Sequence, residues 1–386
     1  MEGGDLLAEG GYGCIFYPSI NCRGKETQEI KYISKIQHDD SSSQNEIFIG
    51  SIIIKNIPNY NLFFAPAQSH CNITARKLDF TDMHKCSVIN KKTKKKLINL
   101  KMPYTHGKEI GNFIIKNKNV KLIITNIIHS YQHLLHSIQK LQNINICHFD
   151  IKTHNIIFDT NRNIPILIDF GLSILISKNI HRNMKKLQLY FYRYVPQYYI
   201  WPLEVHILNY LLHIKKNNEL LNTSDINDIV QQFIDNNKIL KKNFSKTTIN
   251  LYKKLCLSFA RKFIQLPKNK CIERILSYWK TWDNYGLSIC FFKILKFINP
   301  KGFQKNPFII HFSQLLFQNI HPIPSKRFDT ETTLSKFNAF FYNPTINRIS
   351  NYENLFTQLD NSYLNIKNAI FQNMKEMKTL ISLSSR

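Results

Sequence analysis

Two short segments of the chain carry residues whose types and order suit phosphoryl transfer. They read HFDIKTHN, which contains Asp150, and DFG, which begins at Asp169. Phosphoryl transfer needs a carboxylate that accepts a proton from the attacking hydroxyl, a cation near the transferred group, and oxygen ligands for a divalent metal ion. Asp150 can supply the carboxylate and Lys152 the cation. Asn155 and Asp169 can supply hard oxygen ligands for Mg²⁺.

These segments resemble the catalytic loop and the metal-binding loop of eukaryotic-type protein kinases, which read H-R-D-L-K-x-x-N and D-F-G. The match is specific because many chemically distinct residues occur in the same order. The resemblance implies transfer of the ATP γ-phosphate to protein substrates, with Asp150 as the catalytic base. It also implies that Asn155 and Asp169 bind Mg²⁺, with Mn²⁺ as an alternative. Lys152 implies the serine/threonine branch of the family rather than the tyrosine branch.

A glycine-rich segment near the N-terminus, LAEGGYGCI, resembles the loop that covers the ATP phosphates in this family. Glycine suits such a loop because it lets backbone N–H groups approach phosphate closely. Ala8 stands where the family has its first glycine. A glycine cluster is also typical of an ordinary turn, but its place ahead of strand signals favours ATP binding. The resemblance assigns ATP contacts to Gly10, Gly11, Gly13 and Ile15.

Two further parts of an ATP site are expected from the resemblance. Lys35 corresponds to the strand lysine that holds the α- and β-phosphates, and Glu46 corresponds to its ion-pair partner. The interval between them is shorter than is usual in the family, and Glu29 and Lys31 are competing candidates. The hinge that binds the adenine edge corresponds to Met102, Pro103 and Thr105. A proline is acceptable there because only its carbonyl group is needed.

Later motifs follow in the family's order. The segment WPLE resembles the A-P-E that ends the activation segment, DNYGL contains the aspartate that supports the catalytic loop, and PSKR ends in Arg327. The resemblance pairs Glu204 with Arg327 and places Asp283 beneath the catalytic loop. Phe149 departs from the pattern, because many kinases have an arginine there that binds a phosphate on the activation loop. We therefore expect activity without phosphorylation of that loop.

The elements that must position these residues divide the chain into a strand-rich front and a helical back. A hydrophobic fraction of 43% excludes a largely disordered chain. Ser41–Ser43 offer an N-cap for the first helix. Apolar patterns predict strands at 15–17, 30–35, 97–102, 156–158 and 166–168, and helices at 44–56, from about 126, and over most of the chain beyond 204.

Together with the resemblance, this order predicts an α+β fold of the two-lobed protein-kinase type. The expected domains are an N-lobe at 1–105, a mainly helical C-lobe at 106–342 and a basic helical tail at 343–386. The interval between Glu204 and Asp283 is longer than in the family, which indicates a helical insertion at about 206–278.

Basic residues outnumber acidic ones, with 52 Lys and Arg against 26 Asp and Glu, for a net charge of +26. Such a charge attracts acidic proteins, phosphorylated partners and nucleic acid. A general bias of composition toward Lys, Ile and Asn explains it equally well. Because no nucleic-acid-binding module accompanies the charge, we expect it to modify substrate choice rather than to define the function.

The compartment is expected from the cysteines and the N-terminal residues. The eight cysteines are scattered without a CxxC pair, and the segment MEGGDLLAEGG lacks the features of a targeting sequence. We therefore expect reduced thiols in a cytoplasmic protein. No apolar run has the length of a membrane span. The segment GGYGCIFYP and the HFD loop resemble kinases of large nucleocytoplasmic DNA viruses, which implies host cytoplasm and virion as locations and virion proteins as substrates.

Three alternatives compete with an active protein kinase. A pseudokinase or scaffold would use the same fold to bind partners without catalysis, but such proteins usually lack one of the residues named above. A small-molecule kinase is disfavoured by the WPLE and PSKR segments, although the insertion keeps it open. Nucleic-acid binding as the main role is suggested only by the charge.

Overall fold

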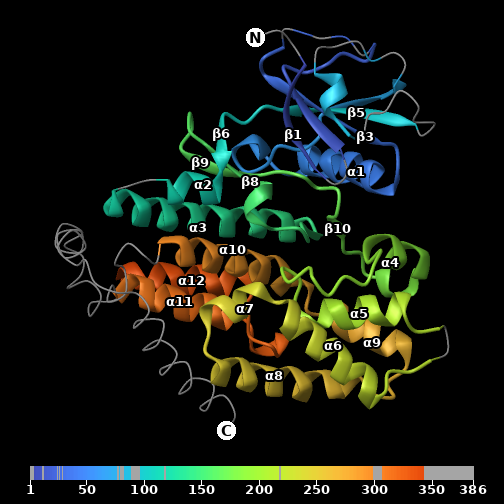
Figure 1. The fold of residues 1–386 in the computed structure, drawn as a ribbon, viewed down its shortest axis with the longest axis vertical. Coiled ribbons are helices and arrows are strands. Elements are labelled where there is room, and N and C mark those ends of the chain that lie inside the picture. Colours follow the sequence, from blue (N-terminus) through green and yellow to red (C-terminus); the bar gives the residue numbers. More distant parts are fainter. Residues whose placement is uncertain are drawn as a thin grey trace. The chain divides into compact units, whose positions relative to one another are not determined.

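The computed structural model describes residues 4–10, 13–23, 25, 27, 29–75, 78, 82–87, 96–116, 119–216, 219–298 and 307–342. The chain forms two compact units, which we call the strand unit and the helical unit (Figure 1). The strand unit consists of Met1–Glu109 with Asn155–Leu175, and the helical unit of Ile110–His154 with Ile176–Arg386. This division differs from the expected boundary after residue 105, because residues 155–175 return to the strand unit.

The strand unit is built on an antiparallel sheet with the strand order β1-β2-β3-β5-β4. In the centre of this sheet, Lys35 lies opposite Ile15 on one side and Leu100 on the other. Strand β3 begins two residues later than predicted and extends to His38. The strands span Asp5–Glu9 (β1), Gly13–Tyr17 (β2), Tyr32–His38 (β3), Ser69–Ile73 (β4) and Leu97–Pro103 (β5).

Helix α1 (Ser41–Asn56) follows β3 after a short turn. Its N-cap is Asp40 rather than one of the three serines. The Asp40 carboxylate accepts hydrogen bonds from the N–H groups of Ser42 and Ser43, at 3.0 and 3.1 Å, and the Ser43 hydroxyl accepts one from the Asp40 N–H. This capping box fixes the start of the helix and therefore its rotation. As a result Glu46 lies on the buried face of α1.

A second, three-stranded sheet explains why residues 155–175 belong to the strand unit. Its strands are β6 (Gly107–Glu109), β8 (Ile156–Asp159) and β9 (Ile164–Leu167), in the order β6-β8-β9. Backbone hydrogen bonds from β8 to β6 attach this hairpin to the end of the first 109 residues. The sequence alone predicted both hairpin strands but not their partner.

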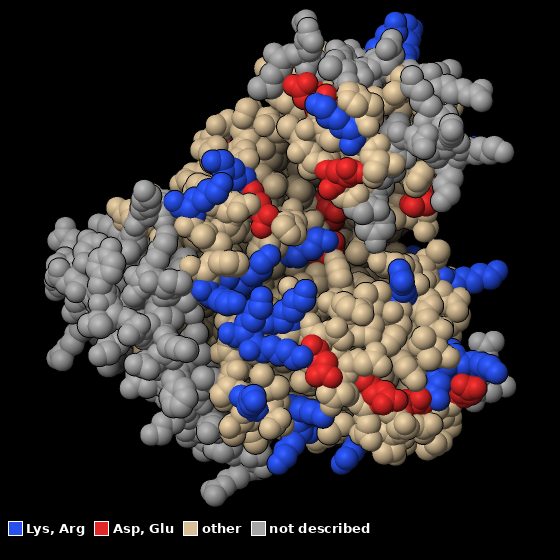
Figure 2. Space-filling view, in the orientation of Figure 1, with Lys and Arg blue, Asp and Glu red and all other residues tan. Residues whose placement is uncertain are grey.

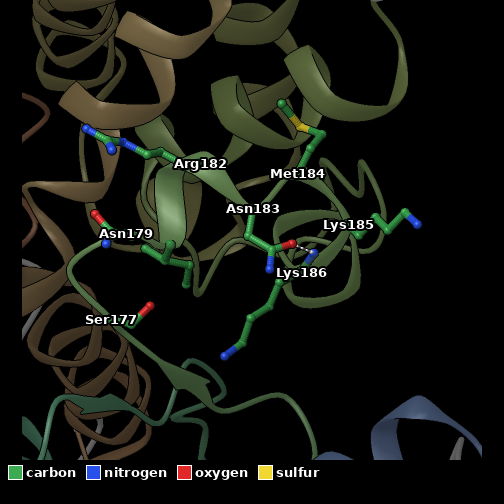
Figure 3. A pocket seen from close by; sticks show the side chains of 8 residues that line it. Ser177, Asn179, Arg182, Asn183, Met184, Lys185 and Lys186 are labelled. Atoms are coloured by element: carbon green, nitrogen blue, oxygen red, sulfur yellow. Dashed lines mark hydrogen bonds between the residues drawn. The ribbon is translucent and has the colours of Figure 1, made fainter.

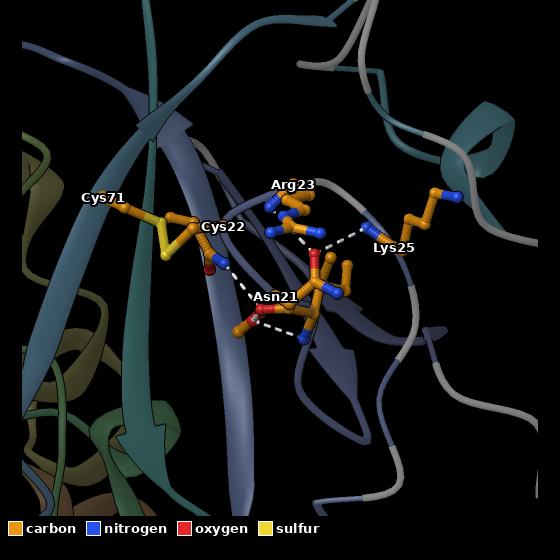
Figure 4. The surroundings of a disulfide bond; sticks show 8 residues. Asn21, Cys22, Arg23, Lys25 and Cys71 are labelled. Carbon is orange, nitrogen blue, oxygen red and sulfur yellow. Dashed lines mark hydrogen bonds between the residues drawn. A yellow bond between two sulfur atoms is a disulfide. The ribbon is translucent and has the colours of Figure 1, made fainter.

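Four of the cysteines form disulfides within the strand unit, which corrects the expectation of reduced thiols. Cys14 pairs with Cys86, with a Cα–Cα distance of 6.1 Å. Cys22 pairs with Cys71, with a Cα–Cα distance of 5.8 Å (Figure 4). The partners lie far apart in the sequence and meet because the sheet folds β2 and β4 around the same core. Among the described residues, the remaining cysteines are buried thiols in the helical unit.

The longest helix described in the helical unit is α3 (Val120–Asn143). Tyr131 of α3 is fully buried and contacts Phe291, Phe312 and Phe337, with ring centroids 4.8 to 5.0 Å apart. These rings come from three other helices and form an aromatic core within the unit. The predicted insertion at 206–278 is helical, with α6 packed against α5 and α8.

The helices of this unit are α2 (Ile110–Ile115), α3 (Val120–Asn143), α4 (Met184–Tyr190), α5 (Leu203–His213), α6 (Thr223–Asn236), α7 (Lys238–Asn243), α8 (Lys246–Ala260), α9 (Lys268–Leu276), α10 (Trp282–Ile298), α11 (Pro307–Asn319) and α12 (Thr330–Tyr342). Two short strands span Ile146–Cys147 (β7) and Ile174–Leu175 (β10). Short 3₁₀ turns occur at Tyr60–Leu62, Met83–Lys85, Thr153–Asn155, Ile180–Arg182, Arg261–Phe263, Trp279–Thr281 and Pro324–Lys326.

The surface of the helical unit is rich in basic side chains. Figure 2 shows Lys and Arg side chains gathered on one face, over the part of the view that these helices occupy. Within the described part of the chain, no helix is both long enough and apolar enough to cross a membrane. The tail predicted at 343–386 lies outside the described residues.

Candidate active site

The strand unit brings Lys35, Glu46 and Asp169 together. The Lys35 ammonium lies 2.8 Å from a Glu46 carboxylate oxygen and 2.9 Å from an Asp169 carboxylate oxygen. The expected Lys35–Glu46 pair is therefore present. The competing Glu29 is exposed and pairs with Lys101 instead. Lys35 reaches both carboxylates because it lies on the central strand β3, between α1 and the segment after β9.

Burial and charge act in opposite directions on this cluster. Burial of the Lys35 ammonium favours its neutral form, but attraction by Glu46 and Asp169 outweighs burial, and the pKa of Lys35 is raised. Burial likewise raises the pKa of Glu46, against the attraction of Lys35. Because Gln37 also donates a hydrogen bond to the Glu46 carboxylate at 3.2 Å, we treat the pair as ionised. A permanently charged Lys35 is suited to holding an anion such as phosphate.

The β8–β9 hairpin places the two expected metal ligands at its open end. Asn155 directly precedes β8, Asp169 follows β9, and the Ile168 N–H donates to the Asn155 carbonyl at 3.0 Å. The Asp169 side chain is about one-third exposed, so it is accessible to a ligand. An amide oxygen and a carboxylate at the same end of a hairpin fit a hard cation such as Mg²⁺. The donor types therefore suit the expected metal.

Helix α1 holds the segment that follows Asp169. The Asn45 amide donates to the carbonyl groups of Gly171 and Ser173 at 3.1 and 2.8 Å. The Phe170 ring is fully buried and contacts Phe64 edge-on. Asp169 itself has φ 67°, a backbone conformation that costs free energy in a residue other than glycine. Such a residue needs support from its surroundings, and α1 and Phe64 provide it.

The glycine-rich segment has a structural role that the sequence did not indicate. A Cβ added to Gly13 would collide with the Ile36 carbonyl oxygen of β3, so Gly13 allows close approach of two strands. The Gly10 N–H donates to the Gly13 carbonyl at 2.9 Å and closes a turn between β1 and β2. Ile15 lies in β2 opposite Lys35, whereas Gly11 lies outside the described residues. The assignment of this turn to ATP remains a prediction.

The expected hinge residues lie at the end of β5 and just after it. Met102 is buried, Pro103 ends the strand, and Thr105 is half-buried. A pocket of about 600 Å³ in the strand unit is lined in part by Pro103 and Thr105, together with Tyr60 and Arg162. The Tyr104 N–H donates to the Lys31 carbonyl at 2.9 Å, so this donor is already used within the protein.

In the helical unit, Asp150 lies between a cation and a hydroxyl. Lys152 donates to one Asp150 carboxylate oxygen at 2.9 Å, and the Tyr198 hydroxyl donates to the other. The Lys152 ammonium also lies 3.2 Å from the Tyr198 hydroxyl oxygen. Asp150 is 3% exposed. The structure therefore places Asp150 and Lys152 together, as the sequence predicted.

Sequence reasoning missed Tyr198, which lies 48 positions after Asp150. Its ring packs edge-on against Trp201, with the centroids 4.6 Å apart. A hydroxyl-bearing side chain shortly before the WPLE segment was the only available signal, and a neighbouring tyrosine, Tyr199, made it ambiguous.

Asp283 holds the backbone of the catalytic loop from α10. Its carboxylate accepts hydrogen bonds from the N–H groups of His148 and Phe149, at 2.7 and 2.8 Å. Burial raises the pKa of Asp283, while these N–H groups and the nearby His148 favour its charged form. The support expected from the DNYGL segment is present. The two hydrogen bonds to Asp283 hold Phe149, directly before Asp150, at φ 65°.

The Phe149 side chain is part of an aromatic cluster, whereas the arginine that many kinases have at this position binds a phosphate. Its ring stacks on Trp201, with the centroids 4.8 Å apart, and contacts Phe191 and Trp282. The Trp201 indole N–H donates to the Phe149 carbonyl at 2.7 Å. Apolar packing therefore attaches residues on both sides of Tyr198 to the segment that contains Asp150. Activity without loop phosphorylation stays a prediction.

The expected Glu204–Arg327 pair is present and fully buried. The Arg327 guanidinium donates to both Glu204 oxygens, at 2.8 and 2.7 Å, and the Trp282 indole donates to one of them. Arg327 also donates to the Thr281 hydroxyl. This bidentate pair joins the start of α5 to the segment before α12 and thereby fixes the end of the segment that contains Tyr198.

Comparisons with known proteins point to protein kinases. No protein-family model matches the chain. One segment of 85 residues is 35% identical to the serine/threonine-protein kinase Nek8 of Danio rerio, covering 22% of this chain and 12% of that protein. Another of 179 residues is 27% identical to the dual specificity protein kinase zakA of Dictyostelium discoideum, covering 45% of this chain and 19% of that protein.

Among solved structures, the autoinhibited serine kinase domain of the giant muscle protein titin aligns with a TM-score of 0.40 and 14% identity. The alignment covers 86% of this chain and 78% of that chain. The strand-rich unit and the mainly helical unit confirm the predicted α+β class. The curated matches, although they span less than a fifth of each relative, support a protein kinase family for this chain.

Proposed function

We propose that the chain is an ATP-dependent protein serine/threonine kinase with Asp150 as its catalytic base. The observation that carries this proposal is the buried Asp150 carboxylate in contact with the Lys152 ammonium and the Tyr198 hydroxyl. A carboxylate that binds a hydroxyl can orient it for attack and accept its proton. The adjacent ammonium can stabilise the negative charge of the transferred group.

The strand unit supplies the second half of the proposed mechanism. Lys35, held in its charged form by Glu46 and Asp169, binds the ATP phosphates. Gly10, Gly13 and Ile15 cover them, and Met102, Pro103 and Thr105 receive the adenine. Mg²⁺, when bound by Asn155 and Asp169, neutralises phosphate charge.

Loss of the Lys35 charge is expected to abolish measurable transfer. We expect the native protein to label serine or threonine in generic acidic and basic proteins when given Mg²⁺ and γ-labelled ATP. Lys35→Met should lower that rate by roughly 100-fold or more, because a fixed cation at the phosphates is lost. Lys55→Met, at an exposed position on α1, is the matched control and should retain the native rate.

Two results would argue against this function. Equal rates in the native protein and Lys35→Met would assign the activity to a contaminant. If ATP raises the melting temperature of the native protein but no phosphate is transferred, the pseudokinase alternative is favoured.

Tyr198 competes with an acceptor for Asp150, which gives a further prediction. Tyr198→Phe removes the hydroxyl and keeps the ring against Trp201. We expect the KM for the protein acceptor to fall about 3- to 10-fold, since one hydrogen bond worth about 1 kcal/mol no longer has to be displaced. Steady-state kinetics with varied acceptor measures this. A fall in kcat at constant KM would instead show that Tyr198 positions Asp150 and Lys152.

The substrates and location belong to the same proposal. We propose protein acceptors, with acidic proteins favoured by the net charge of +26. We also propose the host cytoplasm and the virion as locations, and virion proteins as acceptors, on the basis of the resemblance of GGYGCIFYP to viral kinases. The disulfides remove the separate argument from reduced thiols.

A further inference from the structure

In the segment between the DFG and WPLE motifs, all Asp, Glu, Lys and Arg positions are occupied by cationic side chains. From Phe170 to Leu203 the sequence contains no Asp or Glu. It contains five cations, namely Lys178, Arg182, Lys185, Lys186 and Arg193. In the described part of the chain, none of these five forms an ion pair with a carboxylate, unlike Lys35, Lys152 or Arg327.

Part of this segment lines a pocket in the helical unit. The pocket has a volume of about 480 Å³ and is formed by residues between Ser177 and Lys186 (Figure 3). In Figure 3 the Lys186 side chain extends toward the side of Ser177, and Arg182 and Lys185 leave the pocket wall in other directions. No acidic residue lines the pocket.

The pocket wall is held in place by local contacts. The Asn183 side chain accepts a hydrogen bond from the Lys186 N–H at 2.9 Å. The Lys186 ammonium lies over the Tyr190 ring at 5.6 Å, and Tyr190 is buried. Ile180, which also lines the pocket, is buried. The basic side chains of the pocket therefore extend from a segment that local contacts hold in place.

Cations without a carboxylate partner at the rim of a hollow favour an anionic occupant, because opposite charges at a binding surface direct both orientation and choice of partner. We propose that this pocket binds acidic side chains of the polypeptide acceptor and so gives the enzyme a preference for acidic substrates. The inference rests on the proposed kinase function. A polypeptide is favoured over a free anion because the pocket lies in the same segment as Tyr198, whose hydroxyl contacts Asp150.

The test compares two peptides that share one serine and differ in its flanks, which carry Asp and Glu or Asn and Gln. We expect the native protein to prefer the acidic peptide by about 10-fold in kcat/KM, as several exposed charge pairs together would give. The double variant Lys185→Glu/Lys186→Glu should lower this preference to 2-fold or less. Lys254→Glu/Lys262→Glu, with the same charge change at exposed positions in and just after α8, should retain it.

A second readout separates this inference from the kinase proposal. Fluorescence anisotropy measures binding of the labelled peptides without catalysis, and the same order of variants is expected. If the native protein transfers no phosphate but binds the acidic peptide through Lys185 and Lys186, the pocket stands and the kinase proposal fails. Equal loss of preference in the control variant would overturn the pocket in favour of net charge. Binding of a single-stranded oligonucleotide that is lost in the pocket variant, with no discrimination between the peptides, would overturn it in favour of nucleic acid.

Discussion

Replacing Asp150 with Asn is expected to lower the rate of phosphoryl transfer by roughly 10²- to 10⁴-fold, the usual contribution of a general base. The amide has nearly the same shape as the carboxylate. Its oxygen can still accept a hydrogen bond from Lys152, and its NH2 group can donate one to the Tyr198 hydroxyl oxygen. It cannot take a proton from an acceptor hydroxyl. The substitution therefore removes the proposed chemistry with little change of structure.

Single-turnover transfer from ATP to a protein acceptor would measure the effect of Asp150→Asn. ATP binding, as measured by the shift in melting temperature, should persist because the proposed phosphate-binding residues belong to the strand unit. Asp235→Asn, on the exposed face of α6, is the matched control. If Asp150→Asn keeps the native rate, another group is the base and the proposed mechanism is wrong.

Arg327→Met is expected to destabilise the protein by about 3–5 kcal/mol, because it leaves the buried Glu204 carboxylate without its cation. The side chains of Arg327 and Glu204 are 1% and 0% exposed, so water cannot replace the lost partner. The Trp282 indole would remain as one donor to the carboxylate. For a unit of this size the loss corresponds to a fall in melting temperature on the order of 10 °C.

Urea denaturation of the native protein and variants would measure this loss. Lys270→Met removes a lysine from the exposed Lys270–Glu273 pair and should change the unfolding free energy by less than about 1 kcal/mol. The double variant Arg327→Met/Glu204→Gln should lose less than the sum of its single variants, since it buries no unpaired charge. Strict additivity would contradict a direct coupling between the two residues.

The effects expected for Asp150→Asn and Arg327→Met concern different properties, namely the chemistry and the stability of the protein. Asp150 acts on chemistry and should leave the fold intact, whereas Arg327 acts on the fold and affects chemistry only through the segment ending at Glu204. Comparing rate and stability in both variants therefore separates a catalytic residue from a supporting one.

The sequence by itself determined the chemical groups and much of their local structure. The types and order of Asp150, Lys152 and Asp169 indicated phosphoryl transfer, because that chemistry accepts few other side chains. Helix α1 followed from a capping residue and a helical apolar pattern, although the cap proved to be Asp40. The Lys35–Glu46 and Glu204–Arg327 pairs followed from the order of the motifs, and the structure contains both.

Tertiary structure decided what depends on long-range register. The pairing of β6 with β8 moved residues 155–175 into the strand unit. The sheet brought Cys14 to Cys86 across 72 positions and Cys22 to Cys71 across 49, which no spacing rule foretold. The contact between the Tyr198 hydroxyl and Asp150, and the pocket lined by Arg182, Lys185 and Lys186, depend on how the helical unit packs. Local residue patterns encode helices, strands and reactive groups, but contacts between distant segments arise from packing many surfaces at once, and one sequence does not display those surfaces.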